Sequence, residues 1–123
     1  MLKKYKYMRE TLKDPLRLEH MIEAIDKLTK ATERPDFESL TEKDLEYFGI
    51  VKLLEIIGEA AYKLTVEFKD NHPETPWKYI IAMRHILVHG YYQIKRQDVF
   101  KTIRENLPEL HTQLSNYLNE FDD

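Results

Sequence analysis

The residues best suited to chemistry are an arginine, two histidines and two tyrosines gathered in the stretch Arg84-His85-Ile86-Leu87-Val88-His89-Gly90-Tyr91-Tyr92. A neutral imidazole, with an unperturbed pKa of about 6.5, can accept the proton of a ribose 2′-hydroxyl near neutral pH. A guanidinium offers a rigid fork of donors to phosphate oxygens and to the charge that develops on them in a transition state. Arg84 and His89 therefore suit the cleavage of RNA without a metal ion.

The spacing of these residues limits how they can meet. His85 and His89 are four residues apart, so on a helix their side chains lie about 40° apart on one face. Arg84 and His89 are five residues apart, which on a straight helix separates them by about 140°. They would converge on one phosphate if the helix loosens at Gly90, if the arginine stem bends around the helix, or if a second copy supplies one of them across a twofold axis.

Three simpler interpretations stay open for the same stretch. Arg84 and the histidines could interact with the last carbonyls of a helix, as basic residues often do, and spacing alone favours this because Arg-x4-His arises by chance in many proteins. The pair His85 and His89 could bind a metal, but no Glu follows His85 and no third ligand is evident. Tyr91 and Tyr92 could simply close the core, and Tyr92 fits that role better.

The helices that must position this stretch are marked by capping residues and apolar periodicity. Asp14-Pro15 supplies an N-cap and a proline at the first helical position. An apolar stripe follows at helical spacing, which predicts a helix to about Glu33, where Arg34-Pro35-Asp36 breaks it. The stripe consists of Leu18, Met21, Ile22, Ile25 and Leu28.

A second helix is predicted from Thr41, as its N-cap, to about Lys69, with acidic residues in its first turn. Within it, Gly58 together with Ala60 and Ala61 forms a face of small residues. We expect another helix to approach closely at this face, although small residues can also be tolerated there without a role.

Two further helices complete the predicted fold. Thr75-Pro76 repeats the cap-and-proline signal, and a helix from Pro76 to about His89 is apolar on most sides, which predicts the most buried helix. Gly90 stands where a C′ glycine would end it. A last helix from about Asp98 to Phe121 is interrupted near Asn106-Leu107-Pro108. The sequence predicts a single all-α domain, residues 1–123, built as an antiparallel bundle of four long helices, the last one split into two (a four- to five-helix bundle).

The composition of the chain indicates its cellular location, and its net charge raises a difficulty for binding RNA. The chain has 123 residues, 42% hydrophobic and 33% charged, and it contains no cysteine. With no signal-like apolar segment and no run of roughly 20 apolar residues, we expect a cytoplasmic protein without contact to a membrane. The formal net charge of −3 is not that of a general nucleic-acid binder. RNA would therefore have to meet a local positive site, which an oligomer could assemble.

The stretch from Arg84 to Tyr91 resembles the Arg-x4-His-x-Tyr signature of the HepT-like toxins, within the HEPN superfamily. Further stretches resemble the same family in the same order. They are Leu16-Arg17-Leu18-Glu19-His20-Met21, Glu55-Ile56-Ile57-Gly58-Glu59-Ala60-Ala61, His72-Pro73-Glu74-Thr75-Pro76-Trp77 and Asn106-Leu107-Pro108. Together these ordered matches are far more specific than the short signature alone.

The resemblance implies a HEPN-like all-α fold, a homodimer with the active cleft at its interface, and metal- and cofactor-independent cleavage of RNA rather than DNA. It implies Arg84 and His89 as catalytic residues. It also implies a cognate minimal nucleotidyltransferase antitoxin of the MntA type, which neutralises the toxin by adding AMP to Tyr91. His85 stands where the family commonly has asparagine, so a supporting side chain here carries a charge that depends on pH.

A function of another class is also open. The chain could be a non-catalytic subunit that binds substrate or nucleotide for a minimal nucleotidyltransferase. Both interpretations share the fold and the partner, so only cleavage of RNA by the purified protein separates them.

Overall fold

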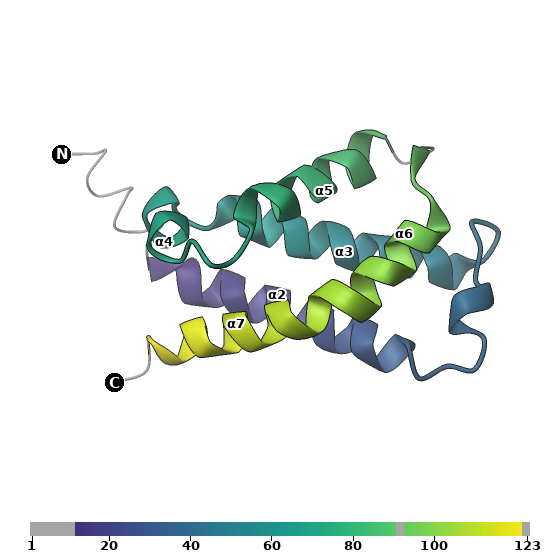
Figure 1. Ribbon diagram of the computed structural model, residues 1–123, viewed down its shortest axis with the longest axis horizontal. Helices are drawn as coiled ribbons and strands as arrows, with labels where there is room; N and C mark the ends of the chain where they lie inside the picture. The colour runs from purple at the N-terminus through teal and green to yellow at the C-terminus, as the bar shows by residue number, and fades with distance from the viewer. Residues whose placement is uncertain (1–11, 91–92, 122–123) are drawn as a thin grey trace.

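The computed structural model describes residues 12–90 and 93–121, and within them the chain forms helices joined by short connections, with no strand (Figure 1). The long elements are α2 (Asp14–Ala31), α3 (Leu45–Lys63), α5 (Trp77–His89) and α6 (Arg96–Lys101) continued by α7 (Leu107–Asn119). A 3₁₀ helix (Phe37–Ser39) and α4 (Val66–Asn71) lie between them. Successive long helices alternate in direction, so the predicted all-α antiparallel bundle is confirmed.

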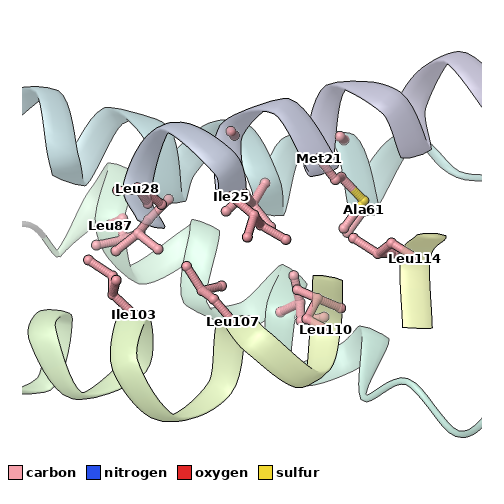
Figure 2. Packing of buried hydrophobic residues seen from close by; sticks show 14 of the residues in the cluster. Met21, Ile25, Leu28, Ala61, Leu87, Ile103, Leu107, Leu110 and Leu114 are labelled. Atoms are coloured by element: carbon pink, nitrogen blue, oxygen red, sulfur yellow. The ribbon is translucent and has the colours of Figure 1, made fainter. Parts of the chain in front are cut away.

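The core of the bundle is centred on α3, which packs against α2 on one side and α5 on the other, while α2 also contacts α7. Figure 2 shows side chains of α2 facing those of the C-terminal helices across this core; Met21, Ile25, Leu28, Ile103, Leu107, Leu110 and Leu114 are among them. None of the described helices is both long and apolar enough to cross a membrane.

The prediction that the helix before Gly90 is the most buried one is wrong. In α5 only Trp77, Ile80 and Leu87 are buried, whereas Ile86 and Val88 are 53% and 40% exposed. The reason is that α5 packs on α3 with one face, whereas α3 has long helices on two sides. Hydrophobicity on most sides of a helix therefore did not mean burial on most sides.

The sequence predicted Asp14 as the N-cap of its own helix, and this prediction is wrong, because Lys13 takes the N-cap position of α2. Asp14 is 1% exposed, and its carboxylate accepts hydrogen bonds from the backbone N–H of Thr65 at 3.0 Å and from the Thr65 hydroxyl at 2.7 Å. The Thr65 hydroxyl in turn accepts from the N–H of Phe68 and caps α4. A buried carboxylate needs such donors, and here they lie at the junction between α3 and α4.

The predicted second helix is therefore two helices. The first of them, α3, ends at Lys63, the backbone is extended at Leu64 and Thr65, and the second, α4, begins at Val66. At its other end the N-cap position belongs to Asp44 and not to Thr41. The Asp44 carboxylate accepts from the N–H of Thr41 at 2.8 Å, which closes the turn before α3.

The start of α5 is anchored to α7. Thr75 is buried; it donates to the side-chain oxygen of Gln113 at 2.7 Å and bonds the Tyr117 hydroxyl at 2.6 Å. It is therefore not the N-cap that the sequence predicted, a position that Pro76 takes instead. The Trp77 indole donates to the carbonyl of His72 at 2.9 Å, so the loop before α5 is held at both of its ends.

The predicted interruption of the last helix is confirmed, and its form is a π-helical turn over Thr102–Asn106. Pro108 follows in the first turn of α7. A proline cannot donate to the preceding turn and its ring crowds the carbonyl there. The wider hydrogen-bonded ring of a π turn accommodates that missing donor, and α6 and α7 run on as one bent helix (Figure 1).

Candidate active site

The stretch from Arg84 to Tyr92 is called the motif below. Its two histidines, His85 and His89, lie together on the last turns of α5. Both are exposed, and their ring centroids are 4.7 Å apart with the planes tilted by 53°. This confirms the expectation that they share one face. Helix α5 stays regular up to His89, and the N–H of Gly90 closes it by donating to the Ile86 carbonyl at 2.7 Å. Gly90 ends the helix as predicted, but with a φ of −117° rather than the left-handed conformation of a C′ glycine.

Arg84 points in another direction, toward α3. Its Nε lies 2.8 Å from Oε2 of Glu59, and about a third of its side chain is exposed. Among the described residues no hydrogen bond or ion pair joins Arg84 to His89. The straight-helix separation of about 140° thus persists, and a single chain does not bring the two groups together.

A groove of about 610 Å³ between α2, α3 and α5 receives Arg84. It is lined by five lysine or arginine side chains and only two glutamates, although the chain as a whole has a net charge of −3. The cations are Lys13, Arg17, Lys52, Lys63 and Arg84, and the glutamates are Glu55 and Glu59. This basic groove is a local positive site of the kind that binding of RNA requires.

Glu59 lies at the centre of the charges in the basic groove. Its Oε1 is 3.6 Å from Nζ of Lys63, and its Oε2 contacts Arg84. Oε2 is buried. It takes part in the ion pair with Arg84 but accepts no hydrogen bond of regular geometry. One turn earlier on α3, Glu55 pairs with Lys52 at 3.5 Å.

Gly58 allows α5 to approach α3 closely at Arg84. A Cβ added at Gly58 would lie less than 3.0 Å from the Arg84 Cβ, a separation that real Cβ atoms essentially never show. The prediction that another helix comes close at the small-residue face is therefore confirmed. Glu59 was not among the residues predicted for the site; its position directly after Gly58 was the available signal.

Exposed apolar side chains surround the motif. Ile86 and Val88 lie on α5, and across the basic groove Leu16 on α2 and Ile56 on α3 are 50% and 37% exposed. Of these four, Leu16, Ile56 and Val88 line the basic groove, and exposed apolar side chains that gather in this way are typical of a surface that another molecule covers.

The described residues contain no group of three or more side chains that could hold a metal ion. The pair His85 and His89 has no third ligand there. Tyr91 and Tyr92 lie outside the described residues, so the expectation that Tyr91 is exposed beside His89 stays a prediction.

Comparison with known proteins gives one consistent result. Residues 21–117 match the family described as Ribonuclease HepT-like. The chain is 36% identical to the "Probable ribonuclease HepT" of Thermococcus cleftensis, over 76% of this chain and 84% of that protein. It is 33% identical to a protein of Caldanaerobacter subterraneus that is named as a candidate RNase, over 84% and 92% of the two chains. No solved structure gives a significant match.

Proposed function

The chain belongs to the HepT-like ribonuclease family, and from this we propose that it is a metal-independent endoribonuclease formed by one domain over residues 1–123. The observation that carries the proposal is the basic groove, which holds Arg84 on the same helix as two exposed imidazoles in a protein of negative net charge. RNA is the substrate, and DNA is not, because the attacking group is the 2′-hydroxyl.

The chemistry assigns one task to each side chain of the motif. His89 takes the proton of the 2′-hydroxyl, whose oxygen attacks the neighbouring phosphorus. The bond from phosphorus to the 5′-oxygen breaks, a 2′,3′-cyclic phosphate stays on the upstream product, and the 5′-oxygen leaves with the downstream product and takes up a proton from water to become a hydroxyl. Arg84 neutralises the charge that develops on the non-bridging oxygens. His85, with its ring 4.7 Å from that of His89, supports the base by contact.

We infer that the working unit is a homodimer. Because Arg84 and His89 of one chain face different directions, a phosphate could contact both kinds of side chain if a second copy lies across a twofold axis at α5. Such a copy would also cover Ile86 and Val88, which are exposed in the single chain. A C₂ arrangement uses the same surface twice and is the commonest form of small oligomers.

One preparation of the purified protein tests both proposals. We expect RNA to be cleaved in the presence of EDTA, with 2′,3′-cyclic phosphate ends detected by mass spectrometry, and a dimer mass by light scattering at micromolar concentration. Loss of cleavage on adding EDTA would instead favour a metal site at His85 and His89. A monomer would contradict the dimer, and with it the joint action of Arg84 and His89 on one phosphate.

The proposed regulation is AMP addition to Tyr91 by a partner nucleotidyltransferase, which would make the two proteins a toxin and its antitoxin. Tyr91 is two residues beyond His89, so an AMP group there would place an anion beside the motif and compete with RNA for the Arg84 donors. Mass spectrometry after incubation with the partner and ATP should show added AMP that Tyr91→Phe abolishes. The matched control Tyr92→Phe should still be modified; the reverse pattern would contradict the assignment.

One observation favours a second function. In the free chain the Arg84 guanidinium is already paired with Glu59, as it would be in a non-catalytic subunit that binds substrate or nucleotide for a minimal nucleotidyltransferase. Such a subunit would bind RNA or ATP without cleaving RNA, and its binding would survive His89→Ala.

A further inference from the structure

We propose that Glu59 is a positioning residue, which orients the Arg84 guanidinium so that its two terminal nitrogens face the basic groove. This inference rests on the ribonuclease function proposed above, because it assigns a residue that acts on the substrate only through Arg84. The contact that carries it is the 2.8 Å ion pair between Nε of Arg84 and Oε2 of Glu59.

Two consecutive residues of α3 hold Arg84 at both ends of its side chain. Gly58 lies against the Arg84 Cβ, where no side chain could fit, and this sets where the arginine stem begins. Glu59 contacts Nε, where the stem ends. With the start and the end both determined by α3, few of the many rotamers of a free arginine remain.

The carboxylate of Glu59 is itself held in place. Lys63, one turn further along α3, approaches its other oxygen at 3.6 Å, and Oε2 is buried. Although the Glu59 side chain as a whole is 37% exposed, a carboxylate that is paired on both oxygens and buried at Oε2 can hold a guanidinium in one orientation. Free arginine carries about 2 kcal/mol of rotamer entropy, so holding it before substrate arrives reduces the loss on binding.

The nitrogen through which Arg84 pairs with Glu59 determines which of its donors remain for a phosphate. An ion pair through Nε leaves the two terminal amino groups, which form the fork that binds two phosphate oxygens at once. Glu59 also places a negative charge beside that phosphate, which opposes binding of RNA. A positioning role and a purely electrostatic role therefore predict different results when the carboxylate is removed.

The test compares Glu59→Ala with Glu55→Ala in steady-state cleavage of RNA. Each variant removes one negative charge and a lysine ion pair from the basic groove, with Lys63 for Glu59 and with Lys52 for Glu55. Only Glu59 also contacts Arg84. We expect kcat to fall roughly tenfold to hundredfold in Glu59→Ala, as misplacement of a catalytic group does, with KM unchanged or lower. In Glu55→Ala we expect KM to fall while kcat stays within twofold.

A second measurement does not depend on activity. The ¹⁵Nε order parameter of Arg84 in the wild-type protein should drop in Glu59→Ala and be retained in Glu55→Ala, with Arg104, which pairs with Glu38, as the unaffected reference. Glu59→Gln keeps a side-chain oxygen beside Nε and should retain more kcat than Glu59→Ala.

The two readouts separate the possible failures. If wild-type protein does not cleave RNA but the order parameter falls as expected, the proposed function is wrong and the positioning stands. An unchanged order parameter, or a kcat that is unchanged or raised in Glu59→Ala, would overturn the positioning role and show Glu59 to be a competitor of the phosphate.

Discussion

Replacing His89 by alanine should lower the rate of RNA cleavage by about 10²–10⁴-fold, the usual worth of a general base. The imidazole is exposed at the end of α5, so its removal leaves no buried cavity and should change the stability of the fold little. The lower rate should therefore reflect a lower kcat and not a smaller amount of folded protein. A gel or fluorescence assay with a defined RNA, at equal concentrations of variant and wild type, measures it.

The matched control is His111→Ala. His111 lies on α7, is half-buried and pairs with Asp26 at 2.9 Å. It is an imidazole that lies neither in the basic groove nor in the motif. Its variant should cleave RNA at the wild-type rate. Circular dichroism should show both variants folded; a His89→Ala protein that cleaves within twofold of wild type would remove His89 from the mechanism.

Replacing Gly58 by alanine should both destabilise the protein and reduce cleavage, although alanine is the better helix former by about 1 kcal/mol. The added methyl group would overlap the Arg84 Cβ, so α5 must shift away from α3. Overpacking of this kind typically costs about 1–3 kcal/mol. Because the shift moves Arg84 itself, the loss of activity should exceed what the fraction of unfolded protein explains.

Gly49 provides the control for this substitution within the same helix. A Cβ there would meet no atom within 4 Å, so Gly49→Ala should raise the free energy of unfolding by up to about 1 kcal/mol. Urea denaturation measures both variants. If Gly58→Ala proves as stable as Gly49→Ala, the close approach of α5 to α3 at Arg84 is wrong.

The elements that the sequence predicted well were marked by signals local to the chain. Gly90 gave the end of α5, Pro108 gave the break that became the π turn, and Gly58 gave the close approach of two helices. Each of these residues limits the backbone or the space next to it by its own chemistry, whatever else surrounds it.

The errors came from partners that are distant in sequence. An aspartate before a proline reads as an N-cap, and nothing local reveals that Asp14 instead binds Thr65. That contact also stabilises the break between α3 and α4, which no glycine or proline marks. For the same reason the motif could be found in the sequence, whereas the pairing of Arg84 with Glu59 could not.

The ion pairs of the basic groove have a consequence for how binding responds to ionic strength. When a protein neutralises phosphates of single-stranded RNA, the released counterions make log K fall with log salt by about 0.7 per phosphate. Here Lys52, Lys63 and Arg84 already face carboxylates of the same chain, which cannot diffuse away when RNA arrives. They keep part of the local negative charge, so fewer counterions leave the RNA. The enzyme should thus bind RNA less tightly in dilute buffer than its five groove cations suggest, and lose less of that affinity as salt rises.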